Sequence, residues 1–67
     1  MIVNNISKLM GERRMSITDL AEKADISYVT ASNLYHHKSI QIRYDVMNKL
    51  CAALGVGIGD LFTYIED

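Results

Sequence analysis

Apolar residues recur along this chain at the spacing of one helical face, but only in short stretches separated by polar residues or glycines. The clearest stretch begins at Ile17 and ends at Ala24, with apolar residues at positions i, i+3, i+4 and i+7. Such a stretch favours a short amphipathic helix that buries one stripe of side chains. We therefore expect an all-α fold, a compact bundle of five helices joined by connections of about two to six residues.

Three of the other helices are expected from the same spacing. Their apolar stripes are Val3, Ile6, Leu9 and Met10 in the first helix, Tyr44, Met47, Leu50, Cys51 and Leu54 in the fourth, and Ile58, Leu61, Phe62 and Ile65 in the last. Gly55 is a typical C-terminal stop for the fourth helix. Residues 37–42 are expected to form a connection, in which Ile40 and Ile42 cover the core.

Two helices are expected to meet at a tight turn around Asp25. Ser16 with Asp19 three residues later resembles a capping box, which predicts the start of the first of these helices. Asp is one of the few residue types that adopt the left-handed conformation at the end of a helix. Ser27 is a good N-cap, because its hydroxyl can accept from free amides of a new helix. The sequence thus predicts a further helix over residues 27–36.

The outward face of this further helix has no charged residue. If Ala31 faces the core, Val29 and Asn33 lie on the opposite side at about 100° per residue, and Thr30 and Ser32 lie on the flanks. An ordinary solvent face would carry Lys or Glu, as the faces of the two neighbouring helices do. This uncharged face with hydrogen-bonding groups is a candidate binding surface.

The charge is unevenly distributed along the 67 residues. A formal net charge of −1 and an isoelectric point near 6.0 argue against a general binder of polyanions. Between Ile26 and Tyr44, however, there is no acidic residue, whereas Lys38 and Arg43 are present. This acid-free segment marks the face that could meet a phosphate backbone.

The motif residues resemble the phage Cro/repressor-type helix-turn-helix family of DNA-binding proteins. The resemblance runs from about Ile6 to Phe62 and lies in SITDLAEKADIS at residues 16–27, in Leu34, in LGV at 54–56 and in DLF at 60–62. It implies a single helix-turn-helix DNA-binding domain over residues 1–67, with the motif at about residues 17–36. The chain departs from the family pattern at Ile17 and Asp25, where the family often has Gln and Gly.

The resemblance also implies how the site residues meet double-stranded DNA. The residues implied to read bases in the major groove are Ser27, Tyr28, Val29, Thr30 and Asn33, and those implied to hold the DNA backbone are Ser32, His36, Lys38 and Arg43. Asn can pair bidentately with adenine, and Val can contact a thymine methyl group. Contacts to phosphates position a protein without reading the sequence.

These features predict a sequence-specific transcriptional regulator, a repressor, that binds double-stranded DNA. The alternative is a helix-turn-helix fold used as a protein-binding module, an anti-repressor or an adaptor. The net charge of −1 favours this alternative, and so does Ile17, which stands where the family often has Gln. The acid-free segment instead favours binding to DNA. The salt dependence of binding to a duplex distinguishes the two.

A homodimer is expected, because one recognition helix covers only a few base pairs. Related regulators place two recognition helices in successive major grooves, ~34 Å apart. Phe62, Tyr64 and Ile65 exceed what a two-turn helix must bury, so we expect a homodimer through residues 56–67. The alternative, that Phe62 and Ile65 complete the core of the monomer, is about equally favoured by the sequence.

Other classes of function have little support in the sequence. It has no Ser/His/Asp set, no pair of carboxylates in a cleft and no glycine-rich phosphate loop, so we expect no enzyme, cofactor or small-molecule substrate. His36 and His37 would point about 100° apart on a helix and would not converge on a metal ion. No apolar run approaches the ~20 residues that span a bilayer, and residues 1–5 lack the features of a signal peptide. We therefore expect a cytoplasmic protein without a membrane partner.

Overall fold

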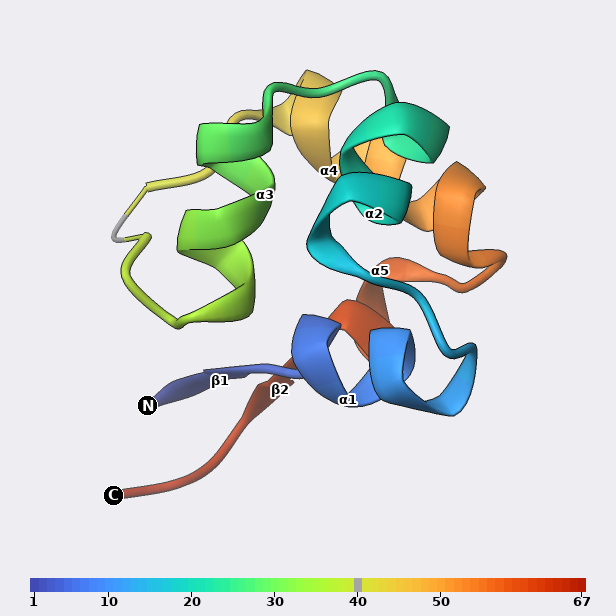
Figure 1. The fold of residues 1–67 in the computed structure, drawn as a ribbon. Coiled ribbons are helices and arrows are strands. Elements are labelled where there is room, and N and C mark those ends of the chain that lie inside the picture. Colours follow the sequence, from blue (N-terminus) through green and yellow to red (C-terminus); the bar gives the residue numbers. More distant parts are fainter. Residues whose placement is uncertain (40) are drawn as a thin grey trace.

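The computed structural model describes residues 1–39 and 41–67. In these residues the helices are α1 (Ile6–Glu12), α2 (Ile17–Ala24), α3 (Tyr28–Tyr35), α4 (Tyr44–Leu54) and α5 (Ile58–Leu61), and the strands are β1 (Ile2–Asn4) and β2 (Phe62–Tyr64) (Figure 1). The expected bundle of five short helices is confirmed for this part of the chain. No helix there is long and apolar enough to cross a membrane.

The prediction of an all-α fold is wrong at the two ends of the chain. β1 and β2 pair antiparallel, with Ile2 opposite Tyr64 and Asn4 opposite Phe62, and they form a short ribbon beside the helices (Figure 1). Beyond the ribbon, the Ile65 amide donates to the Met1 carbonyl at 2.7 Å. Both ends are rich in β-branched and aromatic residues, which favour strands once a partner strand is available.

The first and last helices are therefore shorter than expected. α1 begins at Ile6 rather than near Val3, because residues 2–4 pair with β2, and the Asn4 side-chain oxygen accepts from the Ile6 amide at 2.7 Å. α5 ends at Leu61, and Phe62 already has extended backbone angles. The expected last helix through Ile65 is thus replaced by β2.

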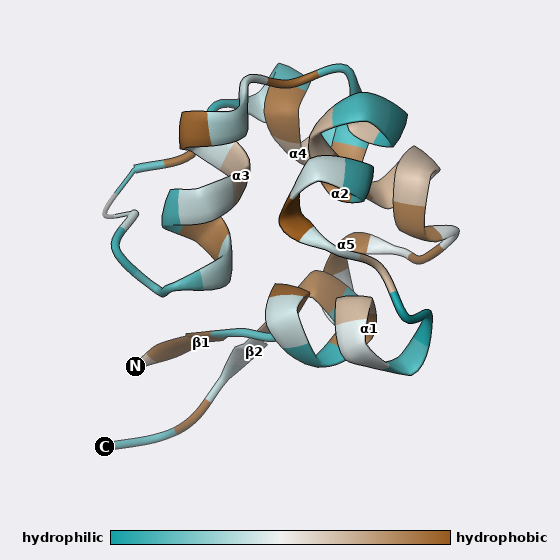
Figure 2. Ribbon diagram, viewed as in Figure 1, coloured by the Kyte–Doolittle hydropathy of each residue, from teal (hydrophilic) through white to brown (hydrophobic). Residues whose placement is uncertain are grey.

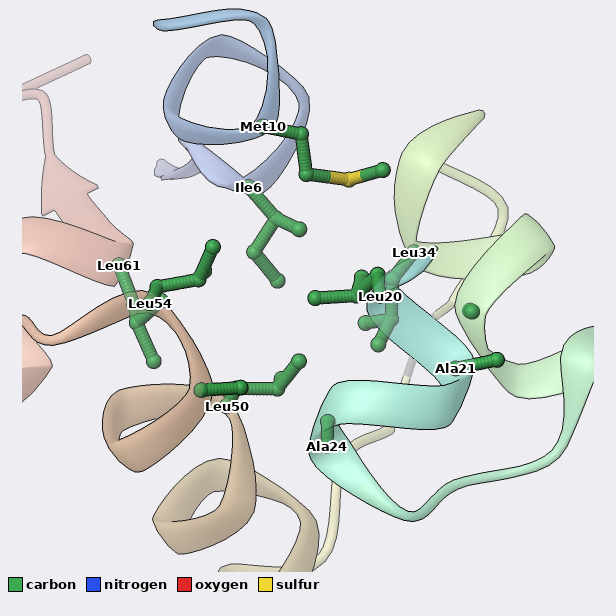
Figure 3. Close-up of a cluster of buried hydrophobic side chains, with 11 residues drawn as sticks. Ile6, Met10, Leu20, Ala21, Ala24, Leu34, Leu50, Leu54 and Leu61 are labelled. Carbon is green, nitrogen blue, oxygen red and sulfur yellow. The ribbon is translucent and has the colours of Figure 1, made fainter. Parts of the chain in front are cut away.

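A single cluster of apolar side chains holds the helices together. Its buried members are Ile6, Met10, Leu20, Ala21, Ala24, Ala31, Leu34, Leu50, Ala53, Leu54 and Leu61 (Figure 3). Leu20 of α2 and Leu50 of α4 point into the centre of this cluster, and both are fully buried. The core therefore joins the two motif helices to α1, α4 and α5.

The apolar stripe of α4 differs from the predicted one at its first residue. Tyr44 is 88% exposed, although the helical spacing predicts it in the core. The buried residues of α4 all lie in its second half, where α2 and α5 pack against the helix. Cys51 and Ile42 pack partly buried against the core, whereas the expected position of Ile40 lies outside the described residues.

The structure confirms the predicted start and end of α2 and the predicted stop of α4 in detail. The Ser16 hydroxyl accepts from the Asp19 amide, and the Asp19 carboxylate accepts from the Ser16 amide, each at 3.0 Å. The hydrogen bond from the Ser16 amide to the Asp19 carboxylate, aided by the Ser16 side chain, holds the pKa of the Asp19 carboxyl below its ordinary value. Asp25 and Gly55 both adopt the left-handed conformation, with φ of 56° and 68°. Local sequence thus determines where α2 and α4 end.

Candidate nucleic-acid interface

The candidate interface is built on α2 and α3, which pack against each other across a tight turn. Asp25 reverses the chain after α2, and the Ile26 amide donates to the Ala21 carbonyl at 3.0 Å. The Lys49 ammonium from α4 donates to the Asp25 carbonyl at 3.2 Å and so fastens the turn to the body of the domain. α3 consequently stands at the edge of the bundle in a fixed position (Figure 1).

Ser27 is the N-cap of α3, as the sequence predicts. Its hydroxyl oxygen accepts from the Thr30 amide at 3.1 Å, and its proton is donated to the Thr30 hydroxyl at 2.8 Å. The Thr30 hydroxyl therefore keeps its own proton for a further partner, whereas the Ser27 hydroxyl is engaged with the helix end. This arrangement fixes both side chains at the start of α3.

The two faces of α3 differ in the expected way. Ala31 and Leu34 are buried against the core, whereas Val29 is 66% exposed and Tyr28 is also exposed. In Figure 2 the first turn of α3 includes a hydrophobic segment, and the helix lies at the edge of the bundle. Such apolar groups in a charge-free surface fit contact with another molecule better than contact with water alone.

Asn33 lies half-buried in the second half of α3. Its side-chain amide makes no hydrogen bond with another described residue, so within that part of the chain both its donor and its acceptor are available. Ser32 is also half-buried on the flank of the helix.

The segment after α3 turns back along the helix and brings Arg43 close to Asn33. A hollow of about 250 Å³ between them is lined by Thr30, Asn33, Leu34, Ser39, Gln41, Ile42, Arg43 and Val46. Ser39 and Gln41 are exposed polar residues that the sequence indicates only as part of a connection. Their place beside α3 depends on the path of the returning chain, which no local pattern predicts.

The C-terminal end of α3 places Lys38 and the two histidines. The Lys38 amide donates to the Asn33 carbonyl at 2.8 Å, and its ammonium has no ion-pair partner among the described residues. The His36 ring stacks edge-on against Tyr35 with 5.0 Å between the ring centroids. The His37 Nε2 instead lies 3.4 Å from the Ser7 hydroxyl, so the two imidazoles have different neighbours.

Arg43 is the N-cap residue of α4 and lies next to the exposed Tyr44. Its side chain is 83% exposed, and its Nε atom lies 3.2 Å from the Asp45 carboxylate. Asp45 is the first acidic residue after the acid-free segment. A cation and a carboxylate thus stand side by side at the edge of the candidate interface.

Two short amphipathic helices that pack against each other across a tight turn form a helix-turn-helix motif. Comparison with known families agrees: the model of the Cro/C1-type helix-turn-helix DNA-binding domain matches residues 5–67. The chain belongs to this family, which confirms the resemblance seen in the motif residues. It is also 33% identical over 66 residues to the uncharacterized HTH-type transcriptional regulator YozG of Bacillus subtilis (strain 168), covering 98% of this chain and 79% of that protein.

Proposed function

We propose that residues 1–67 act as one DNA-binding domain, with its motif at about residues 17–36, in a sequence-specific transcriptional repressor. In this proposal α3 enters the major groove of double-stranded DNA. The observation that supports it most is the uncharged, exposed face of α3, bordered by the cations of Lys38 and Arg43 in a Cro/C1-type fold. Phosphates on either side of the groove would meet these cations while α3 meets the bases.

The proposed base-reading residues lie along the first two turns of α3. They are Ser27, Tyr28, Val29, Thr30 and Asn33. The Asn33 side chain has its NH2 donor and its carbonyl acceptor free of hydrogen bonds to the described residues, so it can pair bidentately with adenine. The exposed Val29 can contact a thymine methyl group. The Thr30 hydroxyl can donate, since it only accepts within the helix cap. Asn33 is therefore the strongest candidate for direct readout.

The proposed backbone contacts lie on the flank and at the ends of this surface. They are Ser32, His36, Lys38 and Arg43. Lys38 offers an exposed ammonium without an ion-pair partner in the described chain, so it loses no existing contact when it binds a phosphate. Such contacts are independent of sequence and depend on salt, because each releases counterions from the duplex.

Replacing Lys38 with glutamine tests this function directly. We expect Lys38→Gln to weaken binding to all duplexes alike and to flatten the slope of log K against log salt by about one unit. Fluorescence anisotropy with labelled duplexes at several salt concentrations measures both. Lys8→Gln is the matched control, since Lys8 lines a hollow with Asp60 and Thr63 on the side of α1, α5 and β2.

An unchanged slope in Lys38→Gln would remove Lys38 from the interface. Equal losses in the Lys8 and Lys38 variants would mean that only overall charge matters. If the unaltered chain binds no duplex, the protein-binding alternative becomes the better account, and the exposed Tyr28 and Val29 are its candidate contact residues.

We further propose that the repressor acts as a homodimer through residues 56–67. Tyr64 and Ile65 are 69% and 51% exposed, and Ile2 beside Tyr64 in the ribbon is exposed as well. Phe62 packs against the core, as the alternative of a completed monomer core predicts for this residue. The exposure of Ile65 disagrees with that alternative. An exposed apolar cluster on a small domain favours contact with a second copy.

Sedimentation equilibrium over a concentration series tests the homodimer. We expect the apparent mass to rise toward twice the monomer mass, and the double variant Tyr64→Ser, Ile65→Ser to stay monomeric. Val29→Ser, which removes exposed apolar surface from α3 instead, should dimerise like the unaltered chain. A protein that is monomeric at all concentrations and binds operator DNA as a single copy would contradict the homodimer.

A further inference from the structure

The ion pair between Arg43 and Asp45 differs from an ordinary pair of surface side chains. The carboxylate oxygen that lies 3.2 Å from Arg43 Nε also accepts from the Val46 amide at 3.0 Å. Amides in the first turn of a helix lack partners within the helix and attract negative charge. The carboxylate is therefore held at the start of α4 and does not depend on Arg43 for its position.

Among the residues that the structure describes, Asp45 is the only hydrogen-bond or ion-pair partner of the Arg43 guanidinium, and the side chain is largely exposed. Arg13, by contrast, donates from Nε to the Leu54 carbonyl at 2.9 Å and from Nη1 to the Leu9 carbonyl at 3.2 Å, so it fastens α1 to α4. Arg43 is thus free to leave its carboxylate, whereas Arg13 serves the fold.

A phosphate and Asp45 compete for the same guanidinium. Arg binds a carboxylate and a phosphate through the same planar set of donors. When a phosphate replaces the carboxylate, Asp45 stays at the helix end, a few ångströms from the new negative charge. Binding must therefore break one ion pair and tolerate one repulsion, and both effects are the same for every DNA sequence.

We propose that Asp45 lowers the affinity of the interface for all duplexes by holding Arg43 and by repelling the phosphate that Arg43 binds. This inference rests on the proposed DNA-binding function. Base contacts made by α3 do not involve Asp45, so its carboxylate weakens the sequence-independent part of binding. Asp45 thereby raises the share of the binding free energy that depends on base readout.

Asp45→Asn tests the proposal, because the amide oxygen of Asn can still accept from the Val46 amide. We expect Kd to fall about threefold to tenfold for preferred and unrelated duplexes alike at low salt. The salt slope should steepen by up to about one unit. Without the carboxylate beside it, Arg43 neutralises its phosphate more fully, so more counterions leave the duplex. In the Arg43→Gln background the same substitution should give a clearly smaller gain. Anisotropy titrations measure all of these values.

Glu12→Gln is the matched control, since Glu12 also lies beside an arginine, with 3.7 Å between its carboxylate and Arg13. It should change Kd less than twofold. Asp45→Ser, which keeps a side-chain acceptor in the first turn of α4, should reproduce the gain of Asp45→Asn and shows whether that gain depends on the new amide group. Circular dichroism at 222 nm checks that each variant keeps its helices.

Unchanged or weaker binding by both Asp45 variants, with the helices intact, would overturn the proposal and make Asp45 an orienting partner of Arg43. An equal gain in Glu12→Gln would overturn it in favour of net charge. If the unaltered chain binds DNA but the Asp45 variants gain nothing, only this inference fails. If the unaltered chain binds no duplex, the proposed function fails and this inference fails with it.

Discussion

Leu50→Ala is expected to lower the free energy of unfolding by about 2–5 kcal/mol. Leu50 is fully buried and points to the centre of the core, between α2 and α5 (Figure 3). A domain of this size has a total stability of about 3–10 kcal/mol at the usual 0.05–0.15 kcal/mol per residue. The substitution therefore removes a large fraction of the stability and lowers the urea concentration at the midpoint of unfolding.

Urea unfolding followed by circular dichroism at 222 nm measures this loss. Val29→Ala is the control, because it also shortens an aliphatic side chain but at an exposed position of α3. It should change the free energy of unfolding by no more than about 0.5 kcal/mol. If the two variants lose similar stability, Leu50 is not central to the core and Val29 is not on a free surface.

Asn33→Ala is expected to weaken binding to the preferred duplex by about 1–3 kcal/mol and to leave binding to unrelated duplexes nearly unchanged. The Asn33 amide has no hydrogen bond within the described chain, and it lies between Thr30 and Arg43 on the hollow beside α3. Its removal would therefore leave the edge of one base without its partner, while the phosphate contacts persist.

A duplex selected from a random library supplies the preferred site, and a scrambled duplex supplies the control. Asn33→Asp serves as a second variant, because it keeps the shape of the side chain but replaces the amide donor with a charge that phosphates repel. It should bind both duplexes more weakly. Equal losses on both duplexes in Asn33→Ala would show that Asn33 holds the backbone, and Val29 or Tyr28 would then become the candidate reader.

The helix-turn-helix could be predicted because its limits are local features of the sequence. The capping box of Ser16 and Asp19, the left-handed Asp25, the N-cap Ser27 and the stop at Gly55 each act within one turn of the chain. The exposure of Val29 follows from its angle to Ala31 on the same helix. Helical geometry alone gives such relations, so they need no knowledge of the tertiary structure.

Features that depend on distant parts of the chain could not be predicted in this way. Val3 and Phe62 fit a helical stripe as well as a strand, and only the meeting of the two chain ends decides for the strand. Tyr44 fits the stripe of α4, but whether another helix covers that turn is a tertiary property. The path that returns Gln41 to the side of α3 is equally non-local.

The central claim is that the surface made by α3, Lys38 and Arg43 binds double-stranded DNA. Titration of the intact protein with one short duplex at salt concentrations from about 50 to 300 mM tests it most directly. With Lys38 on one phosphate and Arg43 shared between a phosphate and Asp45, the plot of log K against log salt should be linear with a slope between about −1 and −2 per bound domain. Absence of binding at the lowest salt, or an affinity that does not change with salt, would contradict the claim.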